Sequence, residues 1–189
     1  MANPSSGWSM TTEDFAKFVA SQQETDADTE MYWAGVRDEW LAKLDSLHGK
    51  IIEFLREYIP GSISYGFTEI ELNEPNIGRY LAKRMDIKIG RQRVSLVPVG
   101  TIIIGCKGRV DVEGSAGRAQ ILLVDGRARS AADLIKVTVN TKGSVPPPPP
   151  AQKGPISWTW KIVTNTAQKG FVDLDRDSFF ALLMEIANA

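Results

Sequence analysis

The chain contains very few of the residues on which redox chemistry, zinc binding and histidine catalysis depend. Its 189 residues include one cysteine, Cys106, and one histidine, His48. A single cysteine excludes an intrachain disulfide bond, and one histidine with one cysteine cannot supply the usual nitrogen and sulfur ligands of zinc. No glycine-rich segment stands between a strand and a helix at the spacing of a phosphate-binding loop. We therefore expect no metal, no cofactor and no catalytic residue that can be named.

Long apolar runs are absent as well. No segment approaches the roughly 18–20 apolar residues that span a bilayer. Residues 1–10 are polar and lack the basic start and the apolar core of a secretory signal. These absences predict a cytoplasmic protein that does not enter a membrane.

What the chain does have is an uneven distribution of charge. Its net charge is −1, but residues 1–76 carry 14 acidic and 5 basic side chains, whereas residues 77–142 carry 13 basic and 5 acidic ones. Such asymmetry indicates either an acidic helical layer that covers a basic sheet, or a basic surface that meets a polyanion.

We predict a flexible tail at residues 1–10 and an acidic helical region at residues 11–60. Thr11 and Asp14 have the spacing of a capping box, which predicts a short helix to about Gln23. The acidic stretch from Glu24 to Glu30 is expected to separate this helix from the next one.

The second helix is predicted from about Asp28 to Ile59, where Pro60 and Gly61 follow as a stop signal. Its length indicates either a helix that lies across a large sheet, which we favour, or a helical arm or dimer seam. The prediction depends on apolar residues that recur at steps of three or four: Trp33, Val36, Trp40, Leu44, Leu47, Ile51, Phe54 and Tyr58.

Residues 61–189 are predicted to form a β-rich domain, because the apolar period changes from 3.6 to 2 after Ser62. The strands follow one another through turns, which favours antiparallel pairing. A change of phase between Phe67 and Ile70 predicts a β-bulge. A Pro-rich loop is expected at 142–155, either as a spacer, which we favour, or as a docking segment. A helix at 176–188, capped by Asp175 or Asp177, is expected to close the chain. The predicted fold is α+β, with one long N-terminal helix among the helices that pack on a curved, mostly antiparallel sheet of seven or eight strands.

The candidate binding residues are basic side chains in or beside turns of the sheet. Arginine at this density suits phosphate groups, to which it donates two hydrogen bonds at once. It equally suits carboxylates of the acidic helices, and we prefer this internal pairing. The set comprises Arg79, Lys83, Arg84, Arg91, Arg93, Arg109 and Arg118.

Carboxylates offer the main route to catalysis. The segment Asp86-Ile87-Lys88 resembles the acid-x-lysine portion of restriction-type nucleases, and Asp111 and Glu113 lie two residues apart on another strand. A magnesium-dependent nuclease can be built from such groups. Alternating charges on a solvent-facing strand have the same appearance.

The function predicted from these features is a non-catalytic intracellular protein-interaction module, with a protein partner or self-association through the long helix. The first alternative is a nucleic-acid-binding protein that uses the arginine-rich turns. The second is the magnesium-dependent nuclease.

Overall fold

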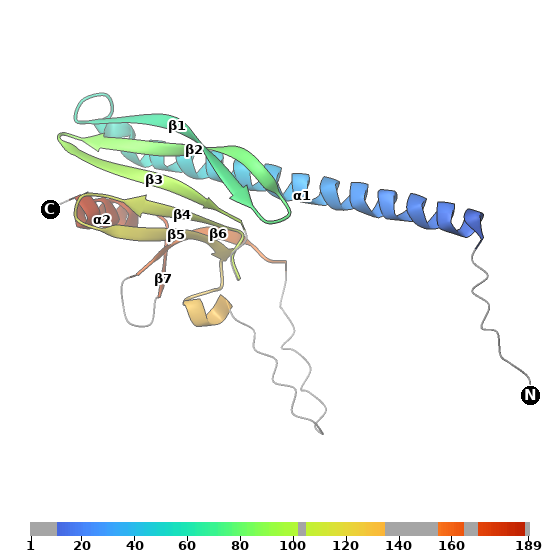
Figure 1. Cartoon of the computed structure of the whole chain (residues 1–189). Helices are drawn as coiled ribbons and strands as arrows, with labels where there is room; N and C mark the ends of the chain where they lie inside the picture. Colours follow the sequence, from blue (N-terminus) through green and yellow to red (C-terminus); the bar gives the residue numbers. More distant parts are fainter. Residues whose placement is uncertain (1–10, 102–104, 135–154, 165–169, 188–189) are drawn as a thin grey trace, which may run out of the picture.

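The protein is described here by a computed structural model that covers residues 11–101, 105–134, 155–164 and 170–187 (Figure 1). A long helix, α1 (Thr12–Leu55), and the short 3-10 turn η1 (Arg56–Tyr58) precede a sheet whose seven antiparallel strands occur in the order of the chain. The strands are β1 (Ile63–Glu74), β2 (Gly78–Ile89), β3 (Gln92–Gly100), β4 (Gly108–Glu113), β5 (Arg118–Asp125), β6 (Trp158–Val163) and β7 (Phe171–Asp173), with the 3-10 turn η2 (Ala131–Leu134) after β5.

The chain closes with helix α2 (Arg176–Ala187), and the sheet does not close on itself. Asp175 caps α2, because its carboxylate accepts a hydrogen bond from the backbone N–H of Ser178 at 2.8 Å. The predicted α+β fold is confirmed. The expected tail at residues 1–10 and all but Pro155 of the expected Pro-rich loop lie outside the described residues.

Helix α1 is continuous, so the predicted break at residues 24–30 is wrong. The capping box is present: Thr11 Oγ1 accepts from the N–H of Asp14 at 3.2 Å, and Asp14 accepts from the N–H of Thr11 at 3.0 Å. No proline or glycine occurs between residues 12 and 34. The hydroxyls of Thr25 and Thr29 donate to carbonyls four residues earlier, which leaves the helical backbone intact.

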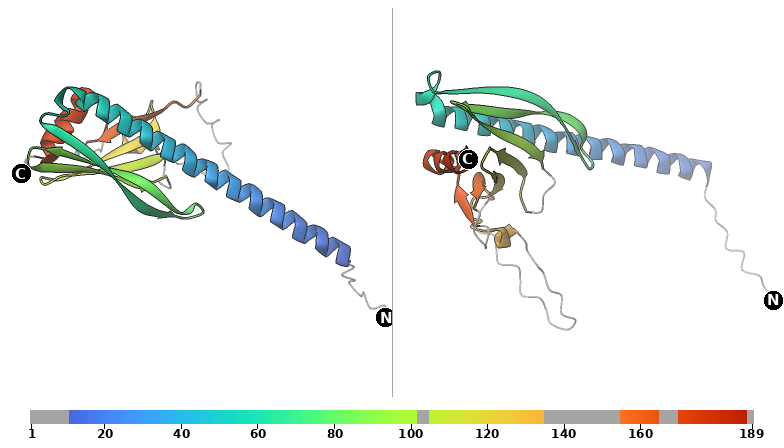
Figure 2. Two further views of the ribbon diagram at one scale, coloured as in Figure 1. Left: turned by 90° about the horizontal axis from the view of Figure 1, so that it is seen from above. Right: turned by 60° about the vertical axis from the view of Figure 1, so that its left-hand side comes forward.

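The C-terminal half of α1 and helix α2 build the main core against one face of the sheet (Figure 2). Met85, Leu96, Val112 and Ala119 are successive neighbours across four strands and all lie in this core. Helix α1 contributes Trp40, Leu44, Leu47, Ile51 and Leu55, and α2 contributes Phe179, Leu182, Leu183 and Ile186.

Trp40 approaches β4 so closely that the residue beneath it has to be glycine. A Cβ atom at Gly108 would lie 2.2 Å from Cζ3 of the Trp40 ring. The side chain of Trp40 is 1 % exposed and also contacts Trp160 of β6, with ring centroids 6.1 Å apart. This contact fixes where α1 crosses the sheet.

The predicted bulge between Phe67 and Ile70 is wrong, because β1 and β2 pair without interruption from Ile63 to Glu74. The change of phase is nevertheless real. In β2 the buried positions shift from Tyr80 and Ala82 to Met85 and Ile87, opposite the shift in β1. Both strands change phase at the same place, so their register is preserved. The irregularity in the sheet occurs instead at Pro98–Gly100 in β3.

A smaller apolar cluster lies apart from the main core and contains Cys106, Leu122, Val124 and Ala128. Burial raises the pKa of the Cys106 thiol, so the thiol stays protonated at neutral pH. The side chain of Cys106 is buried, at 9 % exposed.

Candidate functional surfaces

Five of the seven predicted phosphate-binding side chains form ion pairs within the protein. Only Lys83 reaches α1, where it meets Asp45 at 3.2 Å. The others pair within the sheet: Arg79 with Glu71 at 3.7 Å, Arg84 with Asp86 at 2.9 Å, Arg109 with Asp111 at 2.6 Å and Arg118 with Glu113 at 3.4 Å. Most of these cations are therefore balanced by acids of the sheet itself, and α1 supplies fewer partners than the sequence suggested.

The carboxylates considered for magnesium binding are held by these arginines. Asp111 accepts two hydrogen bonds from Arg109, at 2.6 and 2.7 Å. Asp86 accepts from Ser95 at 2.6 Å and from Arg84 at 2.9 Å. Burial opposes ionisation of Asp86, but these hydrogen bonds outweigh it and lower the pKa of the carboxyl. In the described part of the chain, no three histidine, cysteine or acidic side chains form a group that could hold a metal ion.

Three cations at the turn between β2 and β3 differ from the five ion-paired side chains described above. Lys88, Arg91 and Arg93 are exposed and make no ion pair or side-chain hydrogen bond with any residue in the described ranges. Lys88 and Arg93 stand directly opposite each other in the register, and like charges in that position destabilise a strand pair. We call these three residues the basic turn.

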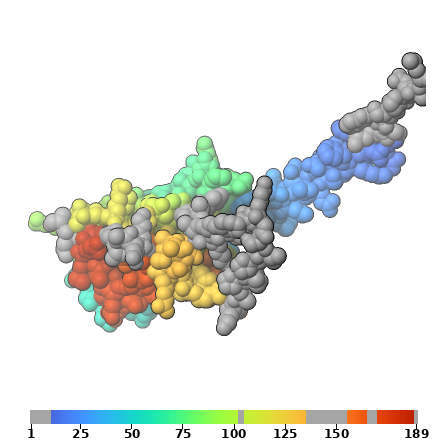
Figure 3. Space-filling view, turned by 90° about the horizontal axis from the view of Figure 1, so that it is seen from below, coloured from blue at the N-terminus to red at the C-terminus, as the bar shows by residue number. Residues whose placement is uncertain are grey.

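The N-terminal half of α1 projects away from the sheet (Figures 1 and 3). Every residue from 12 to 32 is exposed, and we call this segment the arm. Its apolar side chains include Phe15, 64 % exposed, and Met31, 75 % exposed. At about 1.5 Å per residue the arm is about 30 Å long.

The arm is strongly acidic and carries like charges at contact spacing. Its only cation, Lys17, pairs with Glu13 at 3.1 Å. Four acids have no partner among the described residues: Glu24, Asp26, Asp28 and Glu30. Glu24 and Asp28 are four residues apart, as are Asp26 and Glu30, and like charges at this spacing weaken a helix. An isolated helix of this length is marginal in water, so the arm depends on the packed half for its conformation.

The only histidine lies in a groove between α1 and β1 that the sequence did not reveal. His48 is 2 % exposed, and neither ring nitrogen has a hydrogen-bond partner among the described residues. Burial lowers the pKa of its imidazole to about 4, so the ring is neutral at pH 7. The Phe67 ring lies 5.2 Å from it, centroid to centroid. The groove encloses about 470 Å³ and is lined by Asp45, His48, Gly49, Ile52, Phe67, Glu69 and Lys83.

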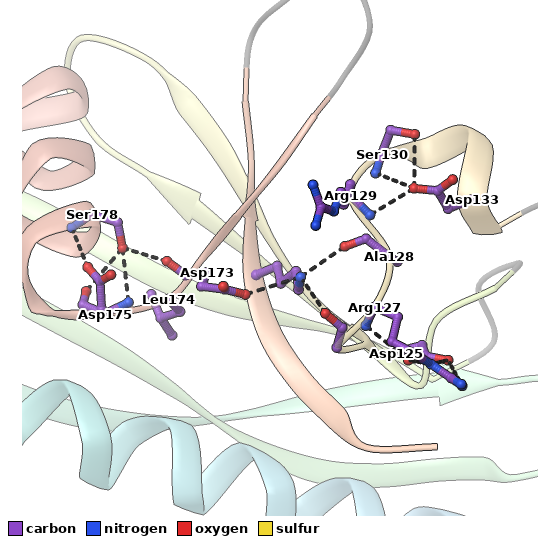
Figure 4. A network of polar contacts seen from close by, with 12 residues as sticks. Asp125, Arg127, Ala128, Arg129, Ser130, Asp133, Asp173, Leu174, Asp175 and Ser178 are labelled. Carbon is purple, nitrogen blue, oxygen red and sulfur yellow. Dashed lines mark hydrogen bonds and ion pairs between the residues drawn. The ribbon is translucent and has the colours of Figure 1, made fainter. Parts of the chain in front are cut away.

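A buried lysine of β6 joins the segment after β5, which carries Ala128, to β7, which carries Asp173; Figure 4 labels both of these partners. Lys161 is 5 % exposed and donates to the backbone carbonyls of Gly126 and Ala128, each at 2.9 Å. It also pairs with Asp173 at 3.1 Å. Every hydrogen of this ammonium group has an acceptor, which marks Lys161 as a structural residue.

A second buried network fixes the tip of the β1–β2 hairpin to the end of β3. Glu74 accepts hydrogen bonds from the backbone N–H of Thr101 at 2.7 Å, from its hydroxyl at 3.0 Å, and from the hydroxyl of Tyr80. Burial, together with the bond to Glu74, raises the pKa of Tyr80 above its ordinary value. Gly100 has a φ of +138°, and a Cβ there would lie 2.5 Å from the Glu74 carboxylate.

No family model, no curated protein and no solved structure matches this chain. Among the helices in the described ranges, none combines the length and the apolar character that crossing a membrane requires. Two surfaces of the described structure, the arm and the basic turn, remain as candidates for binding a partner.

Proposed function

We propose that this protein is a non-catalytic interaction module that docks on another polypeptide through the arm. The observation that carries the proposal is the exposure of large apolar side chains on the arm, which extends beyond the core of the protein. Phe15, Phe18, Met31 and Tyr32 are 64, 58, 75 and 63 % exposed.

Their spacing supports docking by one face of a helix. Phe15, Phe18 and Val19 stand at positions i, i+3 and i+4, which places them together at the end of the arm. A helix that lays such a triplet into an apolar groove is a common mode of protein recognition. Burial of each large side chain contributes about 1.5–3 kcal/mol, enough for the triplet to act as an anchor.

Nucleic-acid binding is the second candidate, and the basic turn is the observation in its favour. Three unpaired cations on an exposed hairpin can contact phosphates, but the ion pairs of the other arginines leave a small footprint. Its test is fluorescence anisotropy with labelled DNA and RNA across about 50–200 mM salt. Binding that weakens with salt and is lost in Arg91→Gln/Arg93→Gln favours this candidate.

Site-specific photocrosslinking in the cells of origin tests the arm. A photoreactive phenylalanine analogue replaces Phe18, and the matched control carries it at Leu81, which is 56 % exposed on β2. We expect covalent adducts of defined mass from position 18 and none from position 81. The masses separate a second copy of this chain from a different protein.

The proposal is contradicted if position 18 yields no adduct or if both positions yield the same adducts. A further control adds Phe15→Ser to the chain that carries the analogue at position 18. This change removes one of the three apolar side chains of the anchor while leaving the body of the protein intact, and it should abolish the adduct.

A further inference from the structure

We infer that the arm docks on the basic turn of a second copy of this chain. This inference rests on the proposed function and names the partner of the arm. Charge complementarity between two surfaces that each carry an excess of one sign, and that form few ion pairs with the described part of their own chain, is its first support.

On the arm, the four unpaired acids repel one another in two i,i+4 pairs. On the basic turn, Lys88 faces Arg93 directly across the strand pair. Each surface thus carries a repulsion that an opposite charge relieves. The two surfaces carry opposite charge, with four acids on the arm and three cations on the basic turn that make no ion pair in the described ranges.

Two of the four acids, Asp26 and Glu30, share a face with the apolar anchor of the arm, whereas Glu24 and Asp28 lie on the opposite face. Residues 15, 19, 22, 26 and 30 follow at steps of three and four on the continuous helix, so Asp26 and Glu30 align with Phe15 and Val19. A single docking surface can therefore take both the anchor and these two acids.

Exposed apolar side chains lie at the same end of the sheet as the basic turn, but on the face that carries the core. Tyr65 of β1, 39 % exposed, pairs with the buried Ile87, whereas Lys88 and Arg93 belong to the opposite face. Ser115 donates to Gln92 at 3.0 Å and to the carbonyl of Ala187 at 2.9 Å, which places the last turn of α2 next to the basic turn. Met184, in that part of α2, is 62 % exposed.

The arm and the basic turn lie at opposite ends of the molecule (Figures 1 and 2). The arm leaves the sheet near the tip of the β1–β2 hairpin, whereas the basic turn lies at the other end of β2. The arm of one copy therefore cannot reach the basic turn of the same copy. The contact between copies joins two different surfaces. Such heterologous contacts propagate into open chains unless a rotation closes them into a ring.

Sedimentation velocity of the full chain tests the inference at about 20 and 300 mM salt, because high salt screens exposed charges. We expect the wild-type mass to rise with protein concentration beyond that of a dimer at low salt, and to fall at high salt. Two variants remove one surface each without introducing new charge: Asp26→Asn/Glu30→Gln for the arm, and Arg91→Gln/Arg93→Gln for the turn. Each should associate with itself at least about tenfold more weakly than the wild type.

The diagnostic step mixes the two variants. The arm variant retains an intact turn, and the turn variant retains an intact arm, so a single productive contact remains. The equimolar mixture should form one-to-one dimers and stop there. Arg79→Gln/Arg129→Gln removes two exposed arginines elsewhere and serves as the charge-matched control, which should assemble like the wild type.

The inference is overturned if the wild type stays monomeric at low salt, if it stops at a dimer, or if the mixed variants fail to pair. A turn variant that assembles normally while the arm variant does not also overturns it. In each case the proposed function is judged separately, by the adducts at position 18. A monomeric wild type that binds labelled DNA through Arg91 and Arg93 would assign the basic turn to nucleic acid instead.

Discussion

The two halves of α1 have the same backbone conformation for different physical reasons. From Trp40 onward the helix buries a continuous apolar stripe against the sheet, and Trp40, Leu47 and Ile51 are each at most 1 % exposed. From residue 12 to residue 32 it buries nothing. Helix propagation is cooperative, so the packed half can extend the helix beyond the surface that stabilises it. The continuity of a helix therefore does not show that packing stabilises all of its residues equally.

The two halves also differ in how their acids are balanced. In the packed half, Glu39 meets Lys107 at 3.0 Å and Asp45 meets Lys83 at 3.2 Å, so the sheet supplies cations. In the arm, the four acids between residues 24 and 30 have no partner in the described ranges. The arm is thus the half whose acids are not balanced by the described part of its own chain.

The strongest test of this comparison truncates one aromatic residue in each half. Trp40→Ala leaves a cavity above Gly108 and should lower the free energy of unfolding by about 3–5 kcal/mol. Phe18→Ala should change it by less than about 0.5 kcal/mol. Guanidinium chloride unfolding followed by far-UV circular dichroism measures both. Equal losses would show that the arm packs on the body of its own chain.

The pH dependence of stability is the second test of this comparison, because the titrating group, His48, lies in the packed half of α1. The pKa of His48 is lowered from 6.5 to about 4 by burial, with the Asp45 carboxylate raising it and the Lys83 ammonium lowering it further. Between pH 6.5 and about 4, the unfolded chain therefore binds a proton at His48 that the folded chain does not bind. Stability is complete above pH 6.5 and falls by about 2–3 kcal/mol as the pH drops to 4.

Denaturant titrations at pH 7.0, 6.0, 5.0 and 4.5 measure this loss, and His48→Phe is the control. The variant removes the titrating group from the packed half and should give a flatter profile over the same window. The carboxyl groups of Asp133 and Asp175, whose pKa values are lowered by hydrogen bonds to backbone N–H groups, lose their contributions only at lower pH. Parallel profiles for wild type and variant would show that His48 titrates normally in the folded protein.

A smaller loss is expected far from either half, where polar contacts rather than apolar burial hold the chain. Lys161→Met keeps most of the side-chain volume but leaves two carbonyls without their donor. We expect a loss of about 1–3 kcal/mol. Hydrogen exchange should localise the effect to the segment from Gly126 to Ala128, and an unchanged exchange rate there would contradict the structural role of Lys161.

The smallest effect is expected from strengthening the arm. Asp28→Lys turns the repulsion between positions 24 and 28 into an attraction and should stabilise the arm helix by about 0.2–0.5 kcal/mol. Far-UV circular dichroism of the full chain at low salt should show a small gain in helix, with Asp28→Asn intermediate. The unfolding midpoint of the body should not move. A midpoint shift would mean that the two halves are coupled more tightly than the structure indicates.

Several features of the fold were accessible from the sequence because they depend on local periodicity. The stripe from Trp33 onward, the antiparallel strands after Ser62 and the cap of α2 at Asp175 belong to this class. The continuity of α1 through residues 24–30 was missed, since those residues are weak helix formers and the packed half that propagates the helix lies outside any short window. The shared phase change of β1 and β2 was taken for a bulge, because the sequence of one strand does not show whether the neighbouring strand changes phase at the same place.

The candidate surfaces were predictable only in part. Arg91 and Arg93 belong to the predicted basic set, but sequence spacing could not show that Arg84 and Arg109 would pair with acids two residues away on the same strand. Lys88 flanks the same turn in the sequence but was not in the predicted set. The unpaired state of His48 carries no sequence signal, since it depends on Phe67 arriving from another element.

The position of Trp40 over Gly108 has a consequence for how the chain is made. Because strand order follows chain order, each new strand leaving the ribosome meets a neighbour that has just been synthesised. Helix α1 has no such advantage: it emerges first, and the glycine beneath Trp40 is translated only with β4, after three strands. The nascent protein thus presents its largest apolar stripe early and covers it late. The interval between α1 and β4 is the period of synthesis during which aggregation competes most directly with folding.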